Sequence, residues 1–79
     1  MNYTEIPLNK LQIGKKANVT FIAADSPSER RIQDLGVISG TEIRPLYKSP
    51  SGNPGAYLIR GAVIALRDDI SSRIMVKVI

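Results

Sequence analysis

The chain has 79 residues, with 11 Lys and Arg against 7 Asp and Glu, so its formal net charge is +4. It contains no Cys and no His, which excludes disulfides, zinc sites built from those ligands, and nucleophilic centres that depend on either residue. This length predicts one domain over residues 1–79. The basic charge indicates either an anionic partner or a solvated surface.

The N-terminus lacks a basic segment followed by an apolar one, and no stretch approaches the ~20 apolar residues of a membrane helix. We therefore expect a cytoplasmic protein without direct membrane insertion. Asp68 and Asp69 form the only adjacent acidic pair, and on a turn they are better suited to capping than to holding a cation. The sequence predicts no catalytic, cofactor-binding or metal-ligating residue.

The first elements are a short turn and a strand. Leu8 and Leu11 lie one helical turn apart, and a segment this short forms only by covering one end of a core. Residues 16–24 then favour a strand, because they include several β-branched and aromatic residues. Alternation places Phe21 in the core and Ile22 on the opposite face, which indicates either that both faces are partly covered or that a bulge changes the register.

A short helix follows and is expected to begin at Ser26. Ser26 and Glu29 have the spacing of a capping box, in which each side chain accepts from the other residue's backbone amide. Pro27 would then occupy the first helical position, where its missing N–H has no cost. Ile32 and Leu35 form the apolar side of the helix, which must pack on the sheet to be stable.

Two glycines end this helix and start the next strand. Gly36 lies where the helix stops, since glycine enters the left-handed region without a Cβ clash. Val37 is then placed to cover Ile32, as in a Schellman ending. Gly40 and Thr41 turn the chain into a strand.

Four further strands are predicted, over residues 41–49, 56–60, 63–67 and 74–79. Pro45 cannot donate to a strand ladder, so it indicates an edge strand or a bulge. Asp68 is expected to cap a short helical turn before the last strand. The chain is therefore predicted to be mainly β, a small barrel of about five strands with one short inserted helix and a short N-terminal helical turn. Closure of the barrel would remove exposed strand edges.

Small barrels often bind single-stranded nucleic acid through aromatic side chains beside basic ones. The aromatic residues are Tyr3, Phe21, Tyr47 and Tyr57, and none lies next to a basic cluster. Tyr47 and Tyr57 flank a turn-forming loop and are expected to pack across a hairpin. We therefore expect no nucleic-acid partner, although a basic nucleic-acid-binding barrel stays an alternative.

One block, Arg30–Ile43, has the pattern Arg-Arg-Ile-x-Asp-Leu-Gly-Val-x-x-Gly-Thr-x-Ile. With it, the chain closely resembles the FeoA family, the cytoplasmic companions of the bacterial ferrous iron transporter FeoB. Other segments match in order: Leu8-x-x-Leu11-x-x-Gly14, Ser49-Pro50-x-Gly52-x-Pro54, Ile64-Ala65-Leu66-Arg67 and Ile74-x-Val76. The departures are mild, with Ser39 where a Pro is common and Ser71 where Ala is usual.

The resemblance implies an SH3-like barrel and a non-enzymatic role in ferrous iron uptake, without a cofactor. The implied partner is a FeoB-like membrane transporter with a GTPase domain, contacted by protein–protein interaction. The same barrel also occurs as a regulatory C-terminal domain in iron-dependent repressors, but this chain shows no helix-turn-helix.

Four charged residues of the shared segments are candidates for binding the partner: Arg30, Arg31, Asp34 and Arg67. They form either a docking face for an acidic patch or a surface ion-pair set, in which Arg30 and Asp34 are four apart on the helix. Structural roles are expected for Ser26, Glu29, Ile32, Leu35, Gly36, Gly40 and Leu66.

Overall fold

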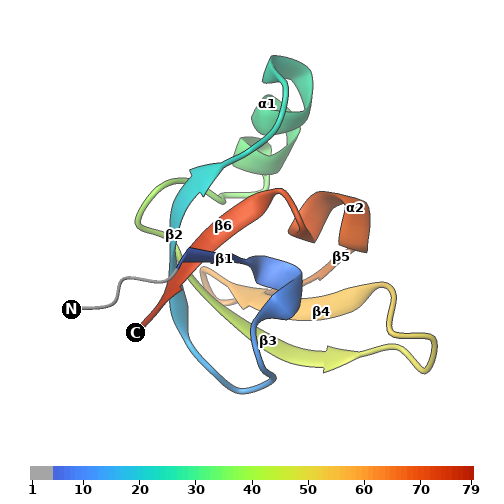
Figure 1. The fold of residues 1–79 in the computed structure, drawn as a ribbon. Coiled ribbons are helices and arrows are strands. Elements are labelled where there is room, and N and C mark those ends of the chain that lie inside the picture. The colour runs from blue at the N-terminus through green and yellow to red at the C-terminus, as the bar shows by residue number, and fades with distance from the viewer. Residues whose placement is uncertain (1–4) are drawn as a thin grey trace.

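Six antiparallel strands form one curled sheet in the order β1-β6-β2-β3-β4-β5 (Figure 1). The computed structural model describes residues 5–79. Its strands are β1 (Glu5–Pro7), β2 (Ala17–Ile22), β3 (Glu42–Lys48), β4 (Gly55–Ile59), β5 (Ala62–Leu66) and β6 (Ile74–Val78). Its helical elements are the 3-10 turn η1 (Leu8–Lys10), α1 (Ser26–Asp34) and α2 (Asp68–Ser71).

The mainly β architecture agrees with the sequence, with one strand more than predicted. The extra strand, β1, pairs with β6 through Ile6 and Val76. The order of strands leaves β1 and β5 at the two ends of the sheet, so the expectation that closure removes all strand edges is wrong. Inside the curl lies an apolar core made of Leu8, Leu11, Ala17, Val19, Ile32, Val37, Ile43, Tyr57, Ile59, Leu66, Ile74 and Val76.

A bulge in β2 reverses the faces that alternation predicts. The pairing of β2 with β6 shifts register between Val19 and Phe21. Val19 is buried, whereas Phe21 is 49% exposed and Ile22 packs against the core. The core position predicted for Phe21 is therefore wrong, because the extra residue turns the following side chains over.

Pro45 also lies at an irregularity, in an interior strand. The pairing of β3 with β4 shifts register between Pro45 and Tyr47. Pro45 is matched with Tyr57, which is 1% exposed, while Tyr47 is 61% exposed. The two tyrosines therefore do not pack across the hairpin as predicted.

The N-terminus of α1 begins one residue earlier than predicted. Asp25 is the N-cap, and its Oδ1 accepts a hydrogen bond from the Ser28 amide at 2.9 Å. Ser26 is thus already helical, so the predicted capping box is wrong; the Ser26 side chain lies outside the described residues. The Glu29 carboxylate accepts from the Gln33 side chain at 3.3 Å instead.

The C-terminus of α1 ends as the glycine predicts. Gly36 has a φ of +90°, and its amide donates to the Gln33 carbonyl at 2.8 Å. Beyond it, the buried Thr41 hydroxyl accepts from the Ile38 amide at 3.0 Å and donates to the Gly36 carbonyl at 3.2 Å. Thr41 thereby fixes the loop that leads from α1 into β3.

The helix α2 has a different cap from the one predicted. Asp68 is its first residue rather than its cap. The Asp68 amide donates to Asn53 Oδ1 at 3.0 Å, although the two residues are 15 positions apart. A side chain from the loop between β3 and β4 therefore supplies the cap.

Candidate functional site

An apolar groove of about 180 Å³ runs between α1, β5 and α2. Its lining comes from Arg31 and Ile32 of α1 and Leu35 just after that helix, from Ala65 and Leu66 at the end of β5 and Arg67 just after that strand, and from Ile70 of α2. The segment at α1 is far in the sequence from those at β5 and α2, and the fold brings them together beside β5, one of the two end strands of the sheet.

One face of α1 forms the first wall. Arg31 and Leu35 are one turn apart with Ile32 between them, so all three lie on the same side of the helix. Ile32 is 1% exposed and anchors α1 to the core, whereas Leu35 is 41% exposed. Of the apolar pair predicted from the sequence, Leu35 therefore keeps part of its surface available at the groove.

The opposite wall is the edge of β5. Ala65, Leu66 and Arg67 are consecutive, and neighbouring side chains of a strand point to opposite faces. Ala65 and Leu66 are on opposite faces of β5, and both line the groove because it lies where the strand ends; Arg67 follows the strand as the N-cap of α2. The groove therefore lies at the C-terminal end of β5, whose outer edge has no strand partner within the described residues.

Two arginines give the groove its charge. Arg31 and Arg67 are exposed on its two walls, and its lining contains no acidic side chain. Arg67 forms an ion pair with Asp69, with 3.7 Å between Arg67 Nε and Asp69 Oδ1. Both side chains of this pair are mostly exposed, so solvent weakens their attraction.

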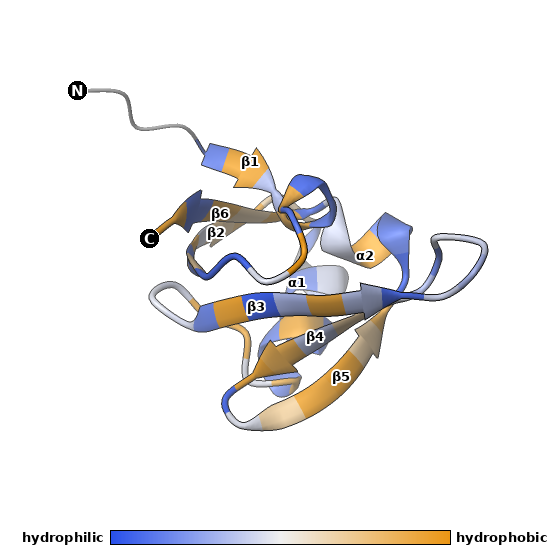
Figure 2. Cartoon of the chain, turned by 90° about the horizontal axis from the view of Figure 1, so that it is seen from below, coloured by the Kyte–Doolittle hydropathy of each residue, from blue (hydrophilic) through white to orange (hydrophobic). Residues whose placement is uncertain are grey.

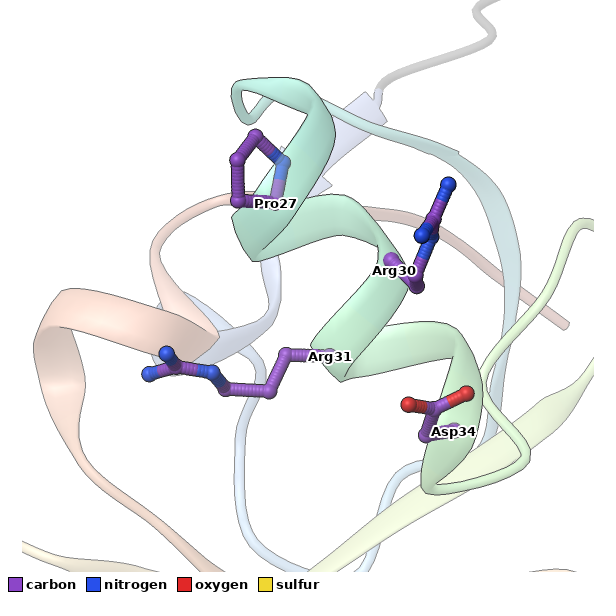
Figure 3. A pocket seen from close by; sticks show the side chains of 4 residues that line it. All are labelled: Pro27, Arg30, Arg31 and Asp34. Carbon is purple, nitrogen blue, oxygen red and sulfur yellow. The ribbon is translucent and has the colours of Figure 1, made fainter.

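The outer face of α1 carries a second concave surface, lined by Pro27, Arg30, Arg31 and Asp34 (Figure 3). Figure 3 shows Arg31 reaching toward α2, while Arg30 points away from both Arg31 and Asp34. Within residues 5–79, no ion pair joins Arg30 to Asp34. The structure thus brings Arg31 and Arg67 to one groove and leaves Arg30 and Asp34 outside it.

A third hollow, of about 440 Å³, lies over β3 and β4 and is lined by Gly40, Thr41, Glu42, Arg44, Leu58, Arg60 and Gly61. Of the residues that line this hollow, Arg60 also lies near the end of α1, because its Cδ would be 2.9 Å from a Cβ placed on Gly36. The Arg60 stem therefore lies over the C-terminus of α1, where a cation is favoured by the helix dipole.

Two residues that line the groove, Ala65 and Ile70, were not identified as candidate site residues from the sequence. The available signal was weak: Ile70 is the single apolar residue in the predicted polar turn. The described part of the chain contains no cluster of three or more acidic side chains able to hold a metal. None of its helices is long and apolar enough to span a membrane.

Comparison with known proteins agrees with this architecture. The family model of the FeoA domain matches residues 6–78. A FeoA-like protein from Clostridium acetobutylicum is 37% identical, covers 100% of this chain and 91% of its own, and superposes with a TM-score of 0.89. No curated protein matches this chain.

Two further solved structures extend the comparison. FeoA from Chlorobium tepidum is 30% identical, with 94% of this chain and 70% of that chain covered and a TM-score of 0.85. FeoA from Stenotrophomonas maltophilia, solved in complex with zinc and described as an SH3-domain protein, is 29% identical, with 87% and 86% covered and a TM-score of 0.76. The chain has this SH3-like fold and belongs to the FeoA family.

Proposed function

We propose that this chain is a non-enzymatic, cytoplasmic accessory protein of ferrous iron uptake that binds the cytoplasmic part of a FeoB-like transporter. Its membership of the FeoA family supports the link to ferrous iron. The Stenotrophomonas maltophilia relative is described as a candidate activating factor of ferrous iron transport, and the same role is proposed here.

The observation that carries this proposal is the groove between α1 and β5. It combines exposed apolar surface at Leu35 and Ala65 with arginines on both walls, Arg31 and Arg67. Arginine is enriched where proteins bind each other tightly, because its planar head bonds a carboxylate twice and its stem covers apolar surface. An acidic, partly apolar partner surface fits this groove.

Arg30 belongs to the proposed docking face as its outer rim. It lies on α1 one residue before Arg31, points away from Arg31 (Figure 3), and is not part of the groove's lining. Rim charges steer association more than they strengthen the bound state. Arg30→Glu alone should therefore slow binding of the transporter, whereas Arg31→Glu and Arg67→Glu should weaken the complex itself.

The test is a triple variant with Arg30, Arg31 and Arg67 replaced by Glu. A matched control replaces Lys10, Lys15 and Lys16, which are also exposed, by Glu and changes the net charge equally. Both variants should melt close to the wild type, because exposed ion pairs contribute only ~0–1 kcal/mol each.

The arginine variant should lose capture of the transporter's cytoplasmic region and fail to restore ferrous uptake in cells lacking the native copy. The lysine variant should retain both. If the arginine variant melts normally and still supports full uptake, the transporter docks elsewhere and the proposal is wrong.

The nucleic-acid alternative gains no specific support. The exposed aromatic residues Phe21 and Tyr47 belong to different strands, β2 and β3. Neither lines any of the three concave surfaces that carry the arginines.

A further inference from the structure

β5 is an end strand with one partner. It pairs with β4 from Gly55↔Leu66 to Ile59↔Ala62, and no other strand of the described chain lies on its outer side (Figure 2). All five residues of β5 are apolar, and Val63 is 59% exposed. An edge of this kind presents unpaired backbone donors and acceptors to a further strand.

The hairpin register identifies the free groups. Arg60 and Gly61 form the turn between β4 and β5, and both have positive φ, 51° and 83°. A two-residue turn of this kind is closed by a hydrogen-bonded pair, which is Ile59↔Ala62 here. Hydrogen-bonded and non-hydrogen-bonded pairs alternate along an antiparallel ladder. The backbone N–H and C=O groups of Val63 and Ala65 therefore point away from β4. Ala65 is also a wall of the groove.

We propose that the groove binds an extended acidic segment of the partner, which adds to β5 as a further antiparallel or parallel strand. This inference rests on the proposed function and specifies how the docking occurs. Main-chain bonds to Val63 and Ala65 hold the segment, and one of its side chains enters the groove.

Volume and charge define the chemistry of that segment. The groove, at about 180 Å³, is smaller than the ~300–1,000 Å³ typical of small-molecule sites, so it accommodates one large apolar side chain. Carboxylates two positions before and after this anchor lie on the same face of an extended segment and would reach Arg31 and Arg67. The expected segment therefore has a Leu- or Phe-like anchor with Asp or Glu two positions away on either side.

The same charges disfavour a second copy as the occupant. Antiparallel pairing of two β5 strands would bring Arg67 of each copy near Arg60 of the other. These like charges would oppose the contact across the whole edge. An acidic segment would instead be attracted by these arginines.

The experiment titrates the 79-residue protein with the blocked pentapeptide Asp-Ser-Leu-Ser-Asp, which places both acids on the same face as the anchor, and follows backbone amides by NMR. Binding should shift the Val63 and Ala65 amides and slow their hydrogen exchange at least about tenfold, since each gains a partner. A peptide with Asn in place of Asp should bind about tenfold more weakly or worse.

Two changes test the main-chain bonds separately. Ala65→Pro removes an outward N–H that β4 does not use, which an edge strand tolerates; Ala65→Ser keeps that N–H and is the matched control. The proline variant should lose about tenfold or more in affinity, and the serine variant less than about twofold. A peptide N-methylated at alternate residues repeats the test without altering the protein.

Several outcomes would overturn strand addition. These are no binding at millimolar peptide, equal binding of the N-methylated peptide, or binding without protection of Ala65. A dimer abolished by Ala65→Pro would assign the edge to a second copy instead. If Ala65→Pro supports full uptake while the arginine variant does not, strand addition is wrong and the proposed function stands; if both support full uptake, the proposed function itself fails.

Discussion

Replacing Gly36 by Ala tests the element that positions the groove. Gly36 has a φ of +90°, and an L-residue with a Cβ loses roughly 1–2 kcal/mol in the left-handed region. The new methyl would also lie 2.9 Å from Arg60 Cδ. Arg60 is exposed, so its flexible stem can move away, and the backbone strain should dominate. We expect the melting midpoint to fall by about 4–16 °C, at ~4–8 °C per kcal/mol for a domain of this size.

Gly40 offers a matched control. Its φ is +91°, and nothing lies within 4 Å of its would-be Cβ, so Gly40→Ala carries the strain without the contact. Thermal melts followed by circular dichroism should show similar losses for the two variants, with any excess at Gly36 disappearing in an Arg60→Ala background. An unchanged midpoint for Gly36→Ala would refute the left-handed ending of α1. An excess that survives without Arg60 would refute the contact.

Three further outcomes are expected. Thr41→Val should cost ~1–3 kcal/mol in thermal melts, because it leaves the Ile38 amide and Gly36 carbonyl without their side-chain partner; Thr41→Ser should recover most of this loss. The hydrogen bond from the Ser28 amide lowers the pKa of Asp25 from its ordinary value of 3.8, so the ionised carboxylate stabilises the fold above pH 3.8 and this stabilisation is lost as the pH falls through the folded-state pKa. In thermal melts between about pH 6 and about pH 3, Asp25→Asn should therefore lose less stability than the wild type. Identical pH profiles for the two proteins would contradict this cap. With no His or Cys, anaerobic titration calorimetry should reveal no stoichiometric sub-micromolar site for ferrous iron or zinc.

The ends of α1 show which local signals the sequence carries. Gly36 ends the helix where expected, because this position has a positive φ that few residues other than glycine adopt. The start is one residue off because Asp25 and Ser26 are both strong N-cap residues in succession. Pro27 tolerates either choice, so only the packing of α1 in the fold decides between them.

Register within the sheet was harder to predict, because a bulge leaves no fixed mark in the sequence. Ile22 signalled a conflict with simple alternation, and the structure resolves it with a bulge that exposes Phe21. Pro45 signalled its bulge directly, since it cannot donate to the ladder. The cap of α2 by Asn53 had no local signal, because the two partners meet only after the loop has folded back.

The groove depends on the order of strands, which no local pattern contains. Family resemblance singled out Arg31 and Arg67 but grouped them with Arg30 and Asp34, whose side chains the fold directs elsewhere (Figure 3). A run such as Ala65-Leu66-Arg67 has the same appearance in an interior strand as in an edge strand. Only the final position of β5 at the end of the sheet beside α1 leaves its outer edge open to the proposed strand, and this is why the Ala65 amide, rather than any charged side chain, best separates strand addition from simple charge attraction.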